Sequence, residues 1–334
     1  MANTSTQSVL NATDYNSTVN PPVLASGGLP PVLVVFFTLQ QIVFALALVG
    51  NTIVILIFVK YLKLNTNMNI ICVNMAVVDL IQGLGCGVQI LYFFLRWLDN
   101  NKYTCLLKYT LISFPVTTSQ KFMSLATFDR FLAVKFPFVY QKYMTRKVTW
   151  LIVITSYVIS GGFNAPTFFF WNTWEDGIPC LYSLVFQRSY LLSSGLLVFL
   201  CMAISATLYQ FVFITALRYH RRLKKNDNKS ANSSVKRSIR GARFLGVSTI
   251  ISTVAWAPFE FYQVCVGLGY TDIIPETSAN FLVFFGIARC VTNPFIYIWH
   301  RKDFNTSLKK LFSWAETAST ASKRSTRENS VFSY

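Results

Sequence analysis

The chain has 334 residues, of which 53% are hydrophobic and only 13% are charged, and its formal net charge is +17. Soluble domains carry about 25% charged residues, so this composition excludes an ordinary soluble protein. The apolar residues gather in stretches near or above the ~20 residues that cross a bilayer as a helix. The expected spans are residues 31–60, 67–95, 103–135, 148–171, 188–217, 241–268 and 278–299. We therefore expect an all-α membrane protein, a bundle of seven transmembrane helices within residues 31–299, with no separate soluble domain.

Lysine and arginine are concentrated at one end of the predicted spans. If the spans alternate in direction, the basic residues of segments 60–63, 135–147, 218–243 and 301–310 all fall on the same side. Loops enriched in lysine and arginine face the cytoplasm, so we expect a multi-pass protein of the plasma membrane with its N-terminus outside. Attraction to anionic lipid of the inner leaflet accounts for the net charge, and no nucleic-acid partner is expected.

Residues 1–30 are predicted to be an extracellular, glycosylated segment. Asn3, Asn11 and Asn16 each begin an Asn-X-Ser/Thr triplet, the acceptor sequence for N-glycosylation. No cleavable signal sequence is expected, because the first apolar run begins after Pro30 and is long enough to span the membrane.

Five of the seven cysteines lie within spans and are expected to pack as small apolar residues. Cys105, at the outer start of the third span, and Cys180, in the loop between the fourth and fifth spans, both face an oxidising compartment. A disulfide between them is the simplest pairing, with two free thiols as the alternative. The disulfide would hold the loop across the mouth of the bundle.

Several short polar motifs occur in order along the spans. They are Gly50-Asn51, the segment from Asn74 to Asp79, Cys105, Asp129-Arg130-Phe131, Pro137, Trp150, Trp256-Ala257-Pro258 and the segment from Asn293 to Tyr297. Together they resemble the rhodopsin-like (class A) G-protein-coupled receptors, over residues 31 to 314, and residues 293–304 also look like adenosine receptors. The resemblance implies a cell-surface receptor that transmits the binding of an extracellular small molecule or short peptide to heterotrimeric G proteins.

The resemblance also implies a set of switch and coupling residues. They are Asp129, Arg130, Pro137, Tyr209, Trp256, Pro258, Asn293, Pro294 and Tyr297. In this family the arginine pairs with its neighbouring aspartate in the closed bundle and is freed to meet the G protein, while Tyr297 exchanges partners with Arg130 and Tyr209. Pro258 removes an intrahelical hydrogen bond and bends the sixth helix. The alternatives are a snorkelling Arg130 that anchors the helix end and a simple packing kink at Trp256 to Pro258.

The expected ligand site lies above Trp256. Its residues are Ile112, Val116, Phe259, Glu260, Gln263, Val283 and Ile287. Ile112 stands where amine receptors of the family have an aspartate, which disfavours an amine held by that contact. Ile287 stands where opsins have the retinal lysine, which excludes covalent retinal. A carboxylate as deep as Glu260 must be paired, hydrated or protonated, and its alternatives are a ligand contact or a structural role beside a polar neighbour.

Arg289 lies one helical turn above Asn293 on the same face of the seventh span. In relatives this face surrounds a sodium ion together with Asp79 and Ser119, and the position of Arg289 is usually neutral. An unpaired arginine at the bilayer midplane costs at least ~2.5–3.5 kcal/mol. We therefore expect Arg289 to take the place of sodium and to pair with Asp79, the alternative being a turn toward Glu260 or a water-filled cavity.

Two segments follow the last span. Residues 300–314 are expected to form an amphipathic helix on the inner leaflet, because Leu308, Leu311, Phe312 and Trp314 recur at helical spacing among basic residues. Residues 315–334, rich in serine and threonine, are expected to be a disordered cytoplasmic tail and a target of a receptor kinase and arrestin, or simply a solvated tail.

A membrane transporter or channel with seven helices is the alternative function. Transporters show inverted repeats with interrupted helices in corresponding places, which this sequence does not offer. An intramembrane enzyme would need a catalytic group, yet both histidines, His220 and His300, lie at predicted cytoplasmic helix ends. We expect no catalytic residue, no metal and no cofactor.

Overall fold

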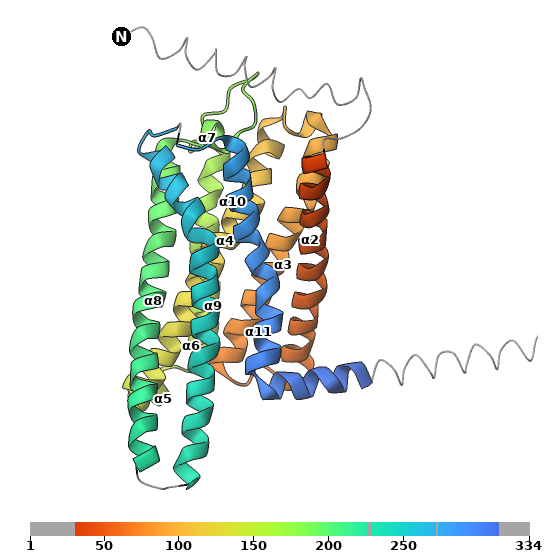
Figure 1. The fold of residues 1–334 in the computed structure, drawn as a ribbon. Helices are drawn as coiled ribbons and strands as arrows, with labels where there is room; N and C mark the ends of the chain where they lie inside the picture. The colour runs from red at the N-terminus through yellow and green to blue at the C-terminus, as the bar shows by residue number, and fades with distance from the viewer. Residues whose placement is uncertain (1–30, 226–228, 272, 314–334) are drawn as a thin grey trace, which may run out of the picture.

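The computed structural model describes residues 31–225, 229–271 and 273–313, which form one helical bundle (Figure 1). In chain order the helices are α2 (Pro31–Leu56), the π-helical η1 (Ile57–Leu62), α3 (Asn67–Phe94), the 3-10 helix η2 (Arg96–Leu98), α4 (Lys102–Lys135), α5 (Pro137–Tyr143), α6 (Arg146–Asn164), the 3-10 helix η3 (Ala165–Phe168), α7 (Tyr182–Val185), α8 (Arg188–Lys225), α9 (Lys229–Gly267), α10 (Glu276–Ala288), the 3-10 helix η4 (Arg289–Val291) and α11 (Thr292–His300). Residues 302–313 form a last helix that lies across one end of the bundle, the end predicted to be cytoplasmic and named so below.

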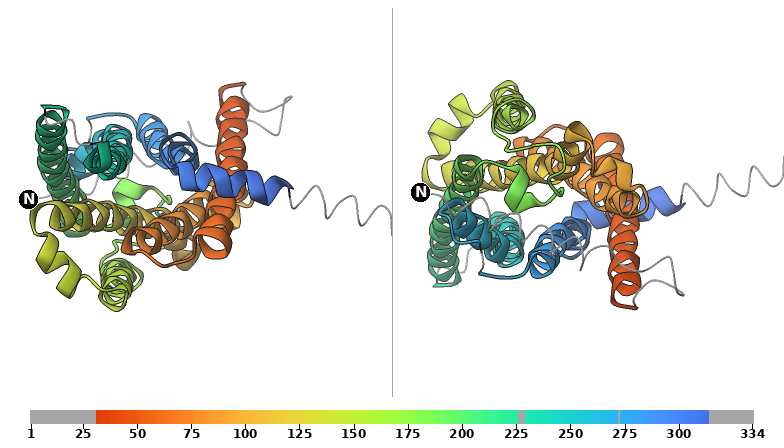
Figure 2. Two further views of the ribbon diagram at one scale, coloured as in Figure 1. Left: turned by 90° about the horizontal axis from the view of Figure 1, so that it is seen from below. Right: turned by 90° about the horizontal axis from the view of Figure 1, so that it is seen from above.

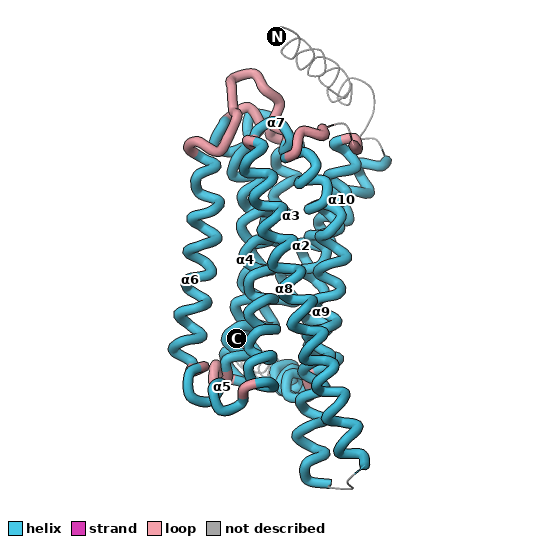
Figure 3. The backbone as a smooth tube through the Cα atoms, turned by 90° about the vertical axis from the view of Figure 1, so that its left-hand side faces the viewer, coloured by secondary structure: helices cyan, strands magenta, loops and turns pink. Residues whose placement is uncertain are grey.

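Each of the seven predicted spans corresponds to one long helix or, as in the seventh span, to consecutive helical segments, which confirms the predicted fold class. The fifth and sixth spans are longer than predicted, because α8 continues to Lys225 and α9 already begins at Lys229. Figure 3 shows these two helices extending together beyond the rest of the bundle. Lysine and arginine are good helix formers, so a chain that has left the apolar layer can remain helical in water.

Five of the spans are long and apolar enough to cross a membrane by composition alone, when only the described residues are searched; these are the helices of residues 31–62, 67–94, 146–168, 188–215 and 278–300. The other two, α4 and α9, are more polar. In α4 the buried residues include Thr117, Thr118, Ser119, Gln120 and Asp129. Because α4 contacts α3, α6, α8 and α9, several of these groups bond to other helices, as Thr117 does to Asn164 and Gln120 does to Ser252.

Pro294 explains both the division of the seventh span and the Gly50-Asn51 motif. Proline has no N–H, so the carbonyl of Cys290, four residues earlier, loses its intrahelical donor, and the helix tightens to η4 just above. The amide of Asn51 in α2 donates to this carbonyl at 3.1 Å. Gly50 allows the approach, because a Cβ there would lie 2.9 Å from the Pro294 ring.

The interior consists of two apolar clusters with a polar layer between them. The cytoplasmic cluster contains Phe58, Met75, Phe122 and Tyr297, whereas the outer cluster contains Trp256 with many aromatic residues. At the intermediate depth lie buried polar residues from several helices. They are Asn51, Asp79, Ser119, Arg289 and Asn293. The two apolar clusters and the polar layer thus follow one another along the bundle.

Candidate functional site

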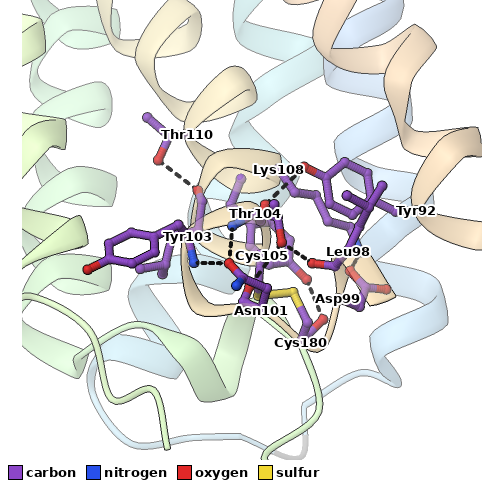
Figure 4. Close-up of a disulfide and its surroundings, with 12 residues drawn as sticks. Tyr92, Leu98, Asp99, Asn101, Tyr103, Thr104, Cys105, Lys108, Thr110 and Cys180 are labelled. Atoms are coloured by element: carbon purple, nitrogen blue, oxygen red, sulfur yellow. Dashed lines mark hydrogen bonds and ion pairs between the residues drawn. A yellow bond between two sulfur atoms is a disulfide. The ribbon is translucent and has the colours of Figure 1, made fainter. Parts of the chain in front are cut away.

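The loop between η3 and α8 closes the outer end of the bundle. The predicted disulfide is present: Cys105 at the start of α4 is bonded to Cys180 in this loop, with Cα atoms 5.9 Å apart (Figure 4). One turn further along α4, the Tyr109 hydroxyl donates to the Cys180 carbonyl at 2.9 Å. Beside the disulfide, Lys108 pairs with Asp99 at 3.1 Å. The loop is therefore fixed across the mouth of the bundle by a covalent bond and a hydrogen bond.

The short helix α7 of this loop lies in the middle of the mouth when the bundle is seen from above (Figure 2). Its Tyr182 ring lies 5.3 Å from the Tyr109 ring and 5.7 Å from the Phe259 ring, centroid to centroid. The Tyr182 hydroxyl donates to Oε1 of Gln263 at 2.8 Å. Sequence reasoning missed Tyr182, whose only signal is its position two residues after Cys180, and it is this residue that links α4 to α9.

The predicted ligand-site residues lie together beneath α7. The apolar members belong to the outer cluster with Trp256; Val116, Phe259 and Ile287 are buried in it, and Ile112 and Val283 pack against it. Gln263 donates from Nε2 to the Leu191 carbonyl at 3.0 Å and to the Ser194 hydroxyl. Glu260 is buried beside them. The site is filled by its own side chains, with Tyr182 seated among them.

Trp256 forms the floor of this region and touches the seventh span. A Cβ on Gly286 of α10 would lie 2.7 Å from the Trp256 ring, so the indole rests directly on the helix backbone. About one turn below Trp256, Ser252 accepts a hydrogen bond from Nε2 of Gln120 at 2.9 Å. A tilt of α9 about Pro258 would therefore move a polar contact with α4 as well as the indole.

In the polar layer, the guanidinium of Arg289 contacts Asp79. Nη2 of Arg289 lies 2.7 Å from Oδ1 of Asp79 and donates to the Ser119 hydroxyl at 2.8 Å. The other carboxylate oxygen accepts from Nδ2 of Asn293 at 2.5 Å, and Asn293 in turn accepts from Ser248 at 3.2 Å. Arg289 and Asp79 are 3% and 0% exposed, so both charges are desolvated. The contact joins α3, α4 and η4 and is the pairing that the sequence suggested.

At the cytoplasmic end, Arg130 is paired with Asp129. Nε of Arg130 donates to Oδ2 of Asp129 at 2.9 Å. The Tyr140 hydroxyl, from α5, donates to the other oxygen at 2.9 Å. Burial raises the pKa of the Tyr140 phenol, and the charge of Asp129 raises it further, so Tyr140 stays a donor. Sequence reasoning missed Tyr140; Pro137, which begins α5 and was predicted to matter, is the nearest signal.

The two predicted tyrosine switches lie on different neighbours. The Tyr209 ring of α8 stacks on Phe213 at 5.8 Å and presses against Gly246 of α9. The Tyr297 ring lies 5.5 Å from Phe58 and 5.5 Å from Phe304 of the last helix. These contacts join α8 to α9 at Gly246, and the seventh span to α2 and to the last helix.

Two apolar side chains of the predicted segments lie on the outside of the bundle. Trp150, matched to the family in the fourth span, is 37% exposed there. Tyr157, two turns later, takes the inward contact, donating to Oδ1 of Asn74 at 3.3 Å. The last helix places Leu308 and Leu311 against the bundle but leaves Phe312 exposed. Asn3, Asn11, Asn16, Trp314 and the tail 315–334 lie outside the described residues.

Comparison with known sequences identifies the class of protein. The profile of the 7 transmembrane receptor (rhodopsin family) matches residues 50–297, so the chain belongs to this family of G-protein-coupled receptors. It is 22% identical to "Rhodopsin, GQ-coupled" of Mizuhopecten yessoensis, over 82% of this chain and 58% of that protein. It is 23% identical to "Trace amine-associated receptor 5" of Rattus norvegicus, over 80% and 82% of the two chains. It is 24% identical to "Adenosine receptor A2b" of Mus musculus, over 83% and 90%. Three receptor types thus match almost equally, and no subfamily is assigned.

The family resolves the function class. Its members are receptors in the membrane that signal through G proteins, and it is not an enzyme family, so the transporter or channel alternative is not favoured.

Proposed function

We propose that the protein is a plasma-membrane receptor that an extracellular small molecule or short peptide activates from the site beneath α7, and that Arg130 carries the signal to the G protein. The observation that supports this most directly is the cytoplasmic ion pair. Asp129 is fully buried and holds Arg130 with help from Tyr140, whereas the Arg130 side chain is 33% exposed. Freeing such an arginine would give a G protein a charged donor at the open end of the bundle.

The proposed route between the two ends runs through α9. A ligand that displaces Tyr182 would change the packing of Phe259, because these two rings lie 5.7 Å apart. It would then also change the packing of Trp256, whose ring lies 6.1 Å from that of Phe259. Pro258 makes α9 the helix that can bend, and Ser252 ties its lower half to Gln120. Movement of this lower half would release Tyr209 from Gly246 and open the end where Arg130 lies.

The test is Arg130→Ala in a cell-based assay of G-protein activation, with surface expression measured in parallel. We expect signalling, including ligand-free signalling, to be abolished while expression stays near wild type, because Arg130 lies at the mouth of the bundle. Arg146→Ala is the matched control, since Arg146 is an exposed arginine at the same end of the bundle. Normal signalling by well-expressed Arg130→Ala would contradict the proposal.

We further propose that Arg289 acts as a tethered cation in the ion-site region of Asp79 and Ser119. The Arg289 guanidinium lies 2.7 Å from the Asp79 carboxylate. It therefore takes the place of the free cation that this carboxylate would otherwise attract. The receptor should therefore be insensitive to sodium.

Sodium sensitivity is measured on the purified receptor by exchanging sodium for N-methylglucamine at constant ionic strength. The melting temperature of the wild type should not change, whereas Arg289→Asn, which restores a neutral polar residue beside Asp79, should gain a sodium-dependent increase. A wild type that sodium stabilises as much as it stabilises Arg289→Asn would show that the site still binds the ion.

The remaining assignments concern residues outside the described parts of the chain. We propose that residues 1–30 are extracellular and glycosylated at Asn3, Asn11 and Asn16, and that the tail is phosphorylated by a receptor kinase and recognised by arrestin. The basic cytoplasmic ends support an interaction with anionic lipid.

A further inference from the structure

Glu260 is a buried carboxylate whose charge is not paired within the described residues. It lies one turn above Trp256 in α9 and is 2% exposed. Its Oε2 has no hydrogen-bond partner among the residues that the structure describes. The four ion pairs formed by the described residues involve Asp79, Asp99, Asp129 and Asp303, and none involves Glu260. Arg289, the arginine of the seventh span, is already paired with Asp79.

The surroundings of Glu260 are aromatic rather than basic. Gln263, three residues further along α9 and on the same helical face as Glu260, accepts a hydrogen bond from the Tyr182 hydroxyl at 2.8 Å, which places Glu260 one turn below the ring that α7 inserts. The Tyr182 ring also lies 5.2 Å from Phe186 and 5.7 Å from Phe259. Aromatic rings present electron-rich faces, and a group of them around a carboxylate is the chemistry that binds organic cations.

Lys108 and Arg188, two basic residues of the outer end, take no part in an ion pair with Glu260 in the described part of the chain. Lys108 pairs with Asp99 at 3.1 Å and lies over the Tyr92 ring at 5.2 Å. Arg188 is exposed, and its guanidinium lies close to Gly269 at the outer end of α9. A carboxylate at this depth is neutralised either by a proton or by a cation that enters from outside.

We infer that this site takes a small organic cation, an ammonium group attached to an apolar or aromatic body, with Glu260 of α9 as its counter-ion. The inference rests on the proposed function for the location of the ligand site. The third-span position that could anchor an amine is the apolar Ile112, so the anchoring charge is supplied by the sixth span instead. The body of the ligand takes the place of the Tyr182 ring against Phe259, and the disulfide-bonded loop limits its size.

The experiment uses purified full-length receptor and two matched sets of probes. The first set is tryptamine, indole-3-ethanol and indole-3-acetate, and the second is phenethylamine, 2-phenylethanol and phenylacetate; within a set only the charge of the head group changes. Binding is measured as the ligand-dependent increase in melting temperature, which requires no G protein. The variants are Glu260→Gln and Glu260→Lys, and the control is Glu175→Gln, an exposed carboxylate of the disulfide-bonded outer loop.

We expect at least one amine to stabilise the wild type and Glu175→Gln while its neutral and acidic counterparts do not. Glu260→Gln should weaken amine binding at least about tenfold, and Glu260→Lys should favour the carboxylates. Binding of an amine that is unchanged in Glu260→Gln, or no stabilisation by either amine at millimolar concentration, would overturn the inference and leave Glu260 a protonated structural residue. Ligand-free signalling of the wild type and of Arg130→Ala is measured in parallel. If Arg130→Ala abolishes this signalling but no amine binds, this inference fails while the proposed function stands.

Discussion

At the scale of single residues, the buried carboxylates of Asp79 and Asp129 are held by short, specific contacts. Asp79 accepts a hydrogen bond from Arg289 on one carboxylate oxygen and from Asn293 on the other. Asp129 likewise accepts from Arg130 on one oxygen and from Tyr140 on the other. A buried ion pair adds little net stability, because the desolvation of both groups offsets their attraction. Removing one partner is costly, since the other charge is then left alone in a medium that cannot solvate it.

Asp79→Asn should therefore destabilise the receptor by roughly 3–5 kcal/mol, as when one partner of a buried pair is removed. The measurement is the thermal unfolding of purified protein, together with surface expression. Arg289→Gln should be less harmful, because Asp79 keeps Asn293 and can take up a proton or a cation.

The double variant Asp79→Asn with Arg289→Gln supplies the control. It should recover most of the stability lost in Asp79→Asn, because no charge is left unpaired. Equal losses in the single and double variants would show that the contact at 2.7 Å is not the source of the effect.

At the scale of elements, the outer loop and the prolines decide how the helices meet. The loop is joined to α4 by the disulfide and to α9 by the hydrogen bond of Tyr182 to Gln263. Pro294 frees a carbonyl that Asn51 of α2 then satisfies. In both places a local interruption of regular structure creates a contact between segments far apart in the chain, and these contacts position the ligand site and the polar layer.

Replacing Cys105 or Cys180 by serine should lower delivery to the cell surface. The bond closes a segment with a sequence separation of 75 residues, and loss of a native disulfide typically costs about 2–4 kcal/mol. The two single variants and the double variant should behave alike, because each removes the same bond. Flow cytometry of intact cells gives the readout.

Cys265→Ser is the control for this series, because Cys265 is a free cysteine outside the disulfide. It should be delivered like the wild type. A defect as large as that of Cys105→Ser would mean that loss of any thiol, and not loss of the bond, impairs delivery.

At the scale of the whole molecule, the layered interior separates sensing from coupling. The polar layer lies between the outer apolar cluster and the cytoplasmic cluster, and α9 runs through both clusters, from Leu245 to Val266. The basic residues outside this interior gather at the end where α8 and α9 extend furthest. The arrangement gives one end for a ligand and the other for a G protein.

The orientation itself is testable with two epitope tags on the full chain. A tag before residue 1 should be stained on intact cells, and a tag after residue 334 only after permeabilisation, because the basic loops hold the opposite end in the cytoplasm. Enzymatic removal of N-glycans should lower the apparent mass, and the change should disappear when Asn3, Asn11 and Asn16 are replaced by glutamine. Staining of the C-terminal tag on intact cells would contradict the topology.

The sequence by itself determined that the protein lies in a membrane, and it determined the seven spans, the ordered family motifs and the disulfide. Hydrophobic length, positive charge and cysteine position are local properties of the chain. It also suggested the contact of Arg289 with Asp79, since a midplane charge needs a partner and few acidic residues are available. Only the tertiary structure decided which side chains complete each site. Tyr182 and Tyr140 come from connecting segments with no periodic pattern, and Tyr157 rather than Trp150 faces Asn74, because the rotation of a helix is set by its neighbours and not by its own residues.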